Sequence, residues 1–123
     1  MGKHVLLIED EPNISEAIRF ILTRDGFRVS CHHQGCDALD VVRAERPDAL
    51  ILDAMLPGRN GYDILRDLRA EPATAALPVL MLTARGQGRD RELAEAAGAS
   101  GFMAKPFSNA EVLASVRALL GQS

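Results

Sequence analysis

Short runs of apolar residues alternate along the chain with longer segments in which apolar residues recur every three or four positions. A short run that is apolar throughout is typical of a strand buried on both faces of a parallel sheet. The second run is the weakest, because Arg28 and Ser30 alternate with Val29, and we expect it at an edge of the sheet. The predicted strands are residues 5–8, 27–31, 49–52, 79–82 and 101–104.

The longer segments have the period of an amphipathic helix. In the first of them, Ile14, Ala17, Ile18 and Ile21 fall on one helical face. Four more helices are predicted over residues 35–44, around 64–68, around 90–97 and over 112–120.

The fourth predicted helix is unusual, because Leu93 is its only large apolar residue and alanines make up the rest of its core face. Stabilisation by packing follows the buried apolar area, at about 25 cal/mol per Å². This helix should therefore bury little surface and dock weakly. We expect it to be the mobile element of the fold.

Five consecutive strand–helix units predict an α/β fold with helices on both faces of a parallel sheet, a doubly wound arrangement. Right-handed crossovers leave few strand orders, and the order 2-1-3-4-5 places the weak second strand at an edge. No linker or internal repeat divides the sequence, so we expect one domain over residues 1–123. In sheets of this kind, ligands bind beyond the carboxyl ends of the strands.

Composition argues against several functions. The net charge of −3 and the lack of any Lys/Arg run argue against a surface that binds nucleic acid. No apolar stretch is long enough to span a bilayer, and the first residues lack the pattern of a signal peptide. We therefore expect a cytoplasmic protein without membrane contact. Cys31 and Cys36 flank His32 and His33, but ordinary reduced thiols explain them better than a zinc site does.

Acidic, hydroxyl and basic side chains lie where the predicted strands end, so the predicted topology brings them to one crevice. Each has an ordinary explanation by itself, since such residues also cap helices, bond to backbone or are solvated. The residues that follow strands one, three, four and five are Glu9, Asp10, Glu11, Asp53, Thr83 and Lys105.

Taken together, these residue types describe one chemistry. Carboxylates that lie close together repel one another, and a hard cation such as Mg²⁺, which prefers oxygen ligands, relieves the repulsion. A lysine ammonium and a threonine hydroxyl can both stabilise the oxygens of a phosphoryl group. A carboxylate can act as the nucleophile and form an acyl phosphate. The sequence therefore predicts a site for phosphoryl transfer.

The full set of motifs resembles the receiver domain of bacterial two-component response regulators, over the whole chain. This resemblance implies a flavodoxin-like (βα)5 fold and a phosphodonor that is a sensor histidine kinase or a phosphotransfer protein. It also implies a downstream effector domain or protein as partner. The motifs are Leu7-Ile8-Glu9-Asp10-Glu11-Pro12, Leu52-Asp53-Ala54-Met55-Leu56-Pro57-Gly58 with Gly61, Leu82-Thr83-Ala84 and Lys105-Pro106-Phe107.

The resemblance also implies a role for each site residue. Asp53 would be the phosphoacceptor. Asp10 would bind Mg²⁺ directly, Glu9 would act mostly through water, and the backbone carbonyl of Met55 would be a further ligand; Mn²⁺ or Ca²⁺ can substitute. The chain would then be a signalling phosphoacceptor, with self-catalysed phosphotransfer and autodephosphorylation but no separate enzymatic activity.

The remaining family positions concern catalysis and switching. Thr83 and Lys105 would contact the phosphoryl oxygens, and the peptide bond between Lys105 and Pro106 would be cis. Thr83 and Phe102 would switch the face formed by helix four, strand five and helix five. Because Phe102 is not a tyrosine, it has no hydroxyl to bond in an outward position, and we expect its ring to sit mostly inward. Met55 and Arg85 would influence the lifetime of the acyl phosphate.

Three other functions fit the sequence less well. A hydrolase of the haloacid dehalogenase type needs a second acid two residues after the nucleophile, where this chain has Met55. A flavodoxin-like nucleotide binder needs a phosphate loop after the first strand, where Glu9, Asp10 and Glu11 would repel a phosphate. A degenerate receiver that only binds proteins would not need the acidic residues together with Asp53, Thr83 and Lys105.

Overall fold

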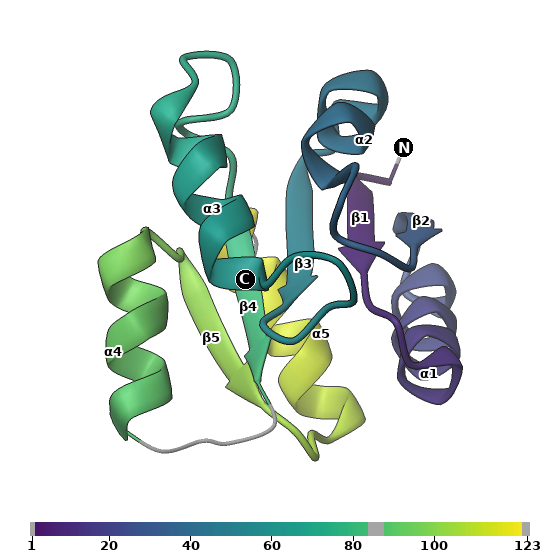
Figure 1. The fold of residues 1–123 in the computed structure, drawn as a ribbon. Helices are drawn as coiled ribbons and strands as arrows, with labels where there is room; N and C mark the ends of the chain where they lie inside the picture. Colours follow the sequence, from purple (N-terminus) through teal and green to yellow (C-terminus); the bar gives the residue numbers. More distant parts are fainter. Residues whose placement is uncertain (1, 84–87, 122–123) are drawn as a thin grey trace.

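The computed structural model describes residues 2–83 and 88–121. In these ranges the chain forms a parallel sheet of five strands in the order β2-β1-β3-β4-β5, with five helices around it (Figure 1). The predicted fold class and strand order are therefore confirmed. The strands are β1 His4–Ile8, β2 Arg28–His32, β3 Ala49–Asp53, β4 Val79–Thr83 and β5 Gly101–Ala104. The helices are α1 Pro12–Arg24, α2 Ala38–Glu45, α3 Gly61–Ala70, α4 Gly88–Ala97 and α5 Asn109–Leu119.

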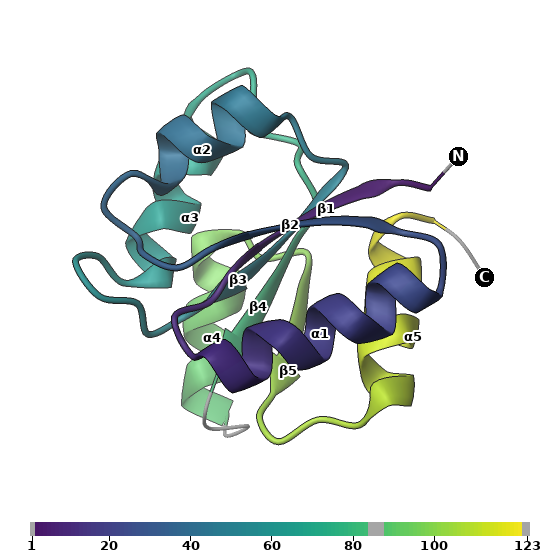
Figure 2. The ribbon, with the colours of Figure 1, turned by 90° about the vertical axis from the view of Figure 1, so that its right-hand side faces the viewer.

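The two faces of the sheet are covered by different helices. Figure 2 shows α1 and α5 on one face and α2, α3 and α4 on the other. Side chains alternate between the faces along each strand, because the side-chain period of a strand is two. In β1, Leu6 and Ile8 join the core on the α2–α3–α4 side, while Val5 and Leu7 join the core on the α1–α5 side. Every residue of β1, β3 and β4 is buried, as the apolar runs predicted.

The second strand lies at the edge of the sheet, as predicted. It pairs only with β1 among the described strands, and its residues are exposed or half-buried. The last pair in this ladder joins Ile8 to His32. The carboxyl end of β2 therefore lies beside the residues that follow β1.

Helix α4 buries small side chains. Ala94 and Ala97 are buried, whereas Leu93 is only half-buried, so the alanines rather than the leucine make up the core face. The turn after α4 has a second attachment, because Arg69 of α3 donates from Nε to the carbonyl oxygen of Gly98 at 2.9 Å. The same guanidinium reaches Oγ of Ser100 at 3.3 Å. Hydrogen bonds from α3 thus supplement the packing of these small side chains.

Several element boundaries differ from the predicted ones. Strands β3 and β4 each run one residue further than expected, so Asp53 and Thr83 are the last residues of their strands. Helix α2 begins at Ala38 rather than at residue 35. Gly35 belongs to the preceding loop, where it packs so closely on the loop between β3 and α3 that an added Cβ would lie 2.6 Å from the carbonyl oxygen of Arg59. In the described part of the chain, no helix has the length and apolar character needed to cross a membrane.

Candidate functional site

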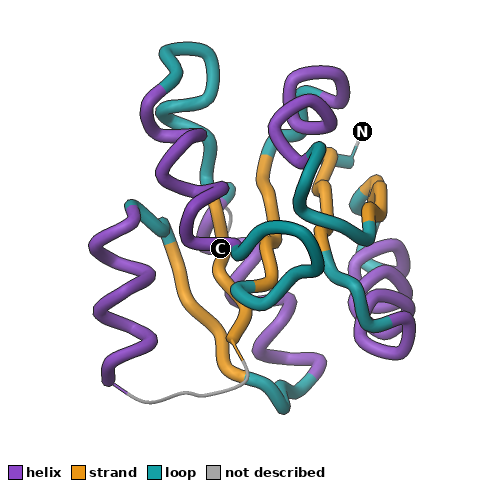
Figure 3. Tube along the Cα trace, in the orientation of Figure 1, coloured by secondary structure: helices purple, strands orange, loops and turns teal. Residues whose placement is uncertain are grey.

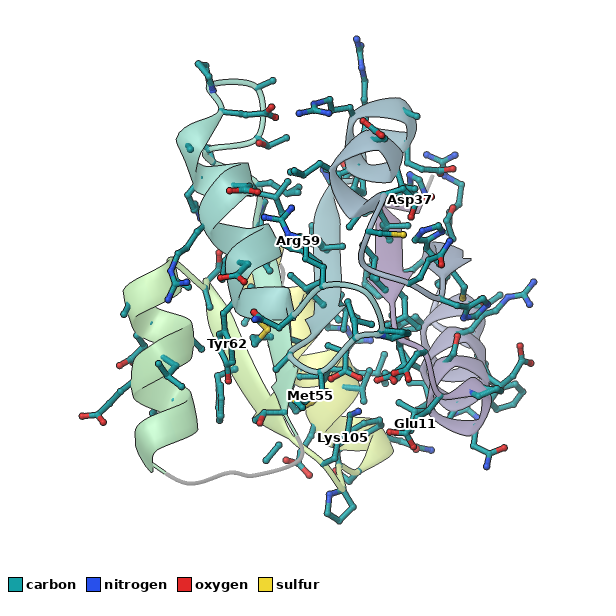
Figure 4. The ribbon with its side chains drawn as sticks, in the orientation of Figure 1. Glu11, Asp37, Met55, Arg59, Tyr62 and Lys105 are labelled. Carbon is teal, nitrogen blue, oxygen red and sulfur yellow. The ribbon has the colours of Figure 1, made fainter. Side chains whose placement is uncertain are left out.

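The predicted site residues come together at the carboxyl ends of the strands. Figure 3 shows the loops after β1, β3 and β5 at the same end of the sheet. In Figure 4 the side chains of Glu11, Met55 and Lys105 lie at this end. Asp53 and Thr83 end adjacent strands there and are almost completely buried, with 2% and 4% of their surface exposed. Sequence positions far apart in the chain therefore form one site.

Lys105 is the cation at the centre of this site. Its Nζ lies 3.0 Å from Oδ2 of Asp53, 3.0 Å from Oε1 of Glu9 and 3.5 Å from Oε1 of Glu11. Burial lowers the pKa of Lys105, but its close contacts with the carboxylates of Glu9 and Asp53, and the charges of both, outweigh this and hold the pKa above its ordinary value. The ammonium therefore stays charged and can attract a phosphoryl group. The peptide bond between Lys105 and Pro106 is cis, as predicted.

Glu9 is a carboxyl group with no exposed surface. Its Oε2 accepts a hydrogen bond of 3.0 Å from the backbone N–H of Glu11. Burial and, after it, the neighbouring Asp53 raise the pKa of Glu9 to about 7, against the opposing effects of the Glu11 N–H and Lys105. Without a further cation, the site thus holds this carboxyl partly protonated near neutral pH.

Asp53 is held in a fixed rotation by the loop that follows it. The backbone N–H of Met55 donates to Oδ1 of Asp53 at 3.0 Å, while Oδ2 faces Lys105. The Met55 side chain points to solvent, with 71% of its surface exposed. This loop packs on the start of α3, where a Cβ on Gly61 would lie 2.3 Å from the carbonyl oxygen of Asp53. Only glycine fits at this point of close approach.

The acidic residues fit a magnesium ion. One oxygen each from Glu9, Asp10 and Asp53 lie within 4.8 Å of one another. Oxygens around an octahedral Mg²⁺ are roughly 3–4 Å apart, so small side-chain rotations would close the set. Oε1 of Glu9 is buried and has no hydrogen-bond partner in the described structure, although Lys105 lies close by. A buried oxygen in this state, beside two further carboxylates, is suited to a cation or to one of its bound waters.

Asp10 does not serve as the N-cap of α1. The N-cap position belongs to Glu11, which makes no side-chain capping hydrogen bond, and proline occupies the first turn. Within the described part of the chain, no hydrogen bond or ion pair holds the Asp10 carboxylate, and its exposure is intermediate. This side chain is therefore available for a ligand.

The predicted switch residues lie on neighbouring strands. Thr83 is buried at the end of β4 and pairs in register with Ala104 of β5. The Phe102 ring is half-buried and packs against the α2–α3–α4 core. The Arg91 guanidinium lies 5.5 Å from its ring centre, a cation–π partner that the sequence did not indicate. Ala84 and Arg85 lie outside the described residues.

Two contacts in the site are not indicated by the sequence. Its pattern assigns Glu11 no separate role, yet this side chain faces Lys105. Its pattern offers His33 only as a neighbour of two cysteines, yet Nδ1 of His33 lies 3.0 Å from the carbonyl oxygen of Glu9. The strand order contains the signal for the second contact, because the end of β2 lies beside the end of β1. Cys31 and Cys36 are both unpaired thiols.

Comparison with known proteins assigns the family. A family model of the response regulator receiver domain matches residues 5–117. The chain belongs to the response regulator receiver domain family. Receiver domains of this kind act in two-component signalling, between histidine kinases and effector domains.

Solved structures of receiver domains superpose on this chain over almost all of its length. A proposed response regulator from Chloroflexus aurantiacus is 34% identical, with a TM-score of 0.94, and the match covers 99% of this chain and 100% of that one. The receiver domain of a sensor histidine kinase from Pseudomonas aeruginosa is 33% identical, with a TM-score of 0.90, over 99% of this chain and 100% of that one. That protein has a magnesium ion coordinated in its active site cleft. A chemotaxis response regulator of Vibrio cholerae is 26% identical, with a TM-score of 0.91, over 98% and 100%.

Proposed function

We propose that this receiver domain is a phosphorylation switch in which Asp53 accepts a phosphoryl group in a Mg²⁺-dependent reaction. The donor would be a phosphohistidine on a sensor histidine kinase or a phosphotransfer protein. The observation that carries the proposal is the setting of Asp53: a buried carboxylate with one oxygen on the Met55 N–H and the other 3.0 Å from the Lys105 ammonium. A nucleophile so oriented, next to a fixed positive charge, suits in-line attack on a phosphoryl group.

Several residues of the site would each have a separate role in the phosphoryl transfer. A carboxylate oxygen of Asp53 forms a bond to phosphorus as the bond from phosphorus to the donor nitrogen breaks, and the imidazole leaves with the electron pair. Lys105 and Thr83 would contact the phosphoryl oxygens and stabilise their charge. The Met55 N–H keeps the carboxylate from rotating, so its geometry is set before the donor arrives. The same site would later hydrolyse its own acyl phosphate.

The metal would be held by residues at the carboxyl ends of β1 and β3. Asp10 and Asp53 would bind Mg²⁺ directly, the backbone carbonyl of Met55 would add a ligand, and Glu9 would act mostly through water. When bound, the ion would supply positive charge against the carboxylates and the incoming phosphoryl oxygens. Mn²⁺ or Ca²⁺ can take its place, since both also bind carboxylate oxygens. The acidic cluster and the magnesium ion of the Pseudomonas relative support this assignment.

The output would pass through the face formed by α4, β5 and α5. Thr83 and Phe102 would couple the site to this face, because they lie on adjacent strands between the phosphoacceptor and α4. The small buried side chains of α4, Ala94 and Ala97, favour movement of this helix over movement of better packed ones. The partner that reads the switch would be an effector domain or protein.

A phosphodonor assay tests the proposed function. The protein is incubated with acetyl phosphate in the presence of Mg²⁺, and its intact mass is measured. We expect the mass of one phosphoryl group to be added with Mg²⁺ and no addition with excess EDTA, because uncompensated carboxylates repel the donor. Release of phosphate from simple phosphate esters with turnover would instead favour a hydrolase. No mass change in either condition would contradict the proposal.

Met55→Asn should shorten the lifetime of the phosphorylated form. The exposed thioether of Met55 cannot orient a water molecule, whereas an amide at this rim position can hydrogen-bond one near the phosphorus. One hydrogen bond of about 1 kcal/mol corresponds to decay that is faster by roughly three- to tenfold. The decay of the added mass is followed after removal of the donor, with Met55→Leu as the matched control. Equal rates for all three proteins would discard the idea.

A further inference from the structure

Two consecutive histidines at the end of β2 contact both backbone polar groups of Glu9. The N–H of Glu9 donates to the carbonyl oxygen of His32 at 3.0 Å. On the other side, Nδ1 of His33 lies 3.0 Å from the carbonyl oxygen of Glu9. A carbonyl oxygen only accepts, so Nδ1 of His33 must carry the proton and donate it. The backbone of Glu9 is therefore held at both of its polar groups.

The His33 ring replaces a backbone hydrogen bond between β1 and β2. The backbone ladder between β1 and β2 ends with the pair Ile8 and His32. In a parallel ladder, the next bond would bring a backbone N–H of the edge strand to the Glu9 carbonyl. Here the ring N–H of His33 supplies that donor, so the ladder continues through a side chain at the edge of the site.

The loop that carries His33 is itself fixed. The His32 ring lies 2.7 Å from Oδ1 of Asp37, which closes the loop on its other side. The N–H of Gly35 donates to the carbonyl oxygen of Pro57 at 3.2 Å and so ties this loop to the loop that carries Met55. His33 is exposed, but these contacts hold the backbone of its loop in place. The ring can therefore keep a fixed position against Glu9.

The carbonyl of Glu9 belongs to the same peptide plane as the N–H of Asp10. Fixing this plane therefore fixes the direction of the N–Cα bond of Asp10, which restricts where its side chain can lie. Asp10 needs such help, because within the described residues no hydrogen bond or ion pair holds its carboxylate. We propose that His33 is a positioning residue that orients the Glu9–Asp10 peptide and thereby strengthens Mg²⁺ binding. The inference rests on the proposed function, since it assigns Asp10 to the metal.

The tautomer of His33 tests the contact itself, without any metal. Two-bond nitrogen–proton NMR spectra of the metal-free protein, recorded where the ring is neutral, report which nitrogen carries the proton. We expect the Nδ1–H form for His33, because the hydrogen bond of one ring nitrogen sets the tautomer. An Nε2–H form would overturn the inference and leave the proposed phosphorylation of Asp53 untouched.

Three variants test the consequence for the metal. His33→Ala removes the donor, His33→Asn keeps an N–H donor the same number of bonds from Cα, and Gln34→Ala changes the adjacent exposed residue as a control. Calorimetric titration with MgCl2 should show a dissociation constant raised roughly three- to tenfold in His33→Ala. His33→Asn and Gln34→Ala should stay close to wild type. A merely structural role would lower the melting temperature without changing Mg²⁺ affinity.

The outcomes separate this inference from the proposed function. Unchanged Mg²⁺ affinity in His33→Ala, together with normal Mg²⁺ binding and phosphorylation of the wild type, would overturn the positioning role alone. Weakened binding in both His33→Ala and His33→Asn would also overturn it, because the amide donor should rescue the contact. A wild type that binds no Mg²⁺ would overturn the proposed function and this inference with it.

Discussion

Asp53→Asn is expected to abolish the mass gain with acetyl phosphate and Mg²⁺ completely. The amide oxygen of asparagine is neutral and a poor nucleophile, so it cannot form the acyl phosphate. The variant should fold, because asparagine has nearly the same shape and can still accept the hydrogen bond from the Met55 N–H. It also removes one of several neighbouring negative charges, which lowers their repulsion in the metal-free protein. Intact-mass measurement reports the loss of phosphorylation, and circular dichroism checks separately that the variant is folded.

Asp40→Asn is a suitable control for this experiment. Asp40 is an exposed aspartate of α2 that pairs with Arg43 and lies outside the site. Its variant should gain the phosphoryl mass as the wild type does. A phosphoryl group that still appears on Asp53→Asn at the wild-type rate would mean that another residue is the acceptor.

Glu9→Gln should stabilise the metal-free protein by about 3 kcal/mol at neutral to alkaline pH, because it removes a buried charge. The pKa of Glu9 is raised from 4.5 to about 7 in the folded protein. Below pH 4.5 the carboxyl is protonated in the folded and unfolded chains alike, so it imposes no cost. Between 4.5 and about 7 the folded protein keeps a proton that the unfolded chain has lost, so stability falls as the pH rises. Glutamine carries no charge, so the variant should lack this fall.

Unfolding with urea in EDTA, across the same pH range, measures this difference. The curves of wild type and Glu9→Gln should meet in acid, separate between pH 4.5 and about 7, and keep that separation at higher pH. Added Mg²⁺ should narrow the gap, because a cation stabilises the ionised carboxylate of the wild type. If the free energies of unfolding of wild type and Glu9→Gln differed by the same amount at every pH, this would contradict the raised pKa of Glu9. Glu16→Gln, an exposed change on α1, is a matched control.

The sequence was sufficient to predict the architecture and the convergence of the candidate residues at one end of the sheet. Buried parallel strands read as unbroken apolar runs, and the one strand with alternating polar residues lies at the edge. The strand order then places Glu9, Asp53, Thr83 and Lys105 at one end of the sheet. Their identities support the proposed phosphoryl transfer, because carboxylates can hold a cation while a hydroxyl and an ammonium can stabilise phosphoryl oxygens.

Features that depend on contacts between loops could not be predicted in the same way. Helix α2 begins later than its apolar pattern suggests, because Gly35 packs against the backbone at Arg59. Leu93 is a large apolar residue of the kind expected in a core, yet α4 buries Ala94 and Ala97 instead. The Glu9 pKa depends on burial, and the His33 contact depends on where one strand ends. The strand order indicates that the ends of β1 and β2 are neighbours, but no sequence pattern shows which side chain makes the contact or how deeply Glu9 is buried.

Chemical trapping of the phosphorylated residue tests the central claim most directly. Borohydride reduces an aspartyl phosphate to homoserine, whereas phosphoserine, phosphothreonine and phosphohistidine are not converted. The protein is phosphorylated with acetyl phosphate and Mg²⁺, reduced, digested and mapped by mass spectrometry. We predict homoserine at position 53, in the peptide that contains Leu52 and Ala54. A phosphoryl group that resists reduction, or homoserine at another aspartate such as Asp10, would contradict the account.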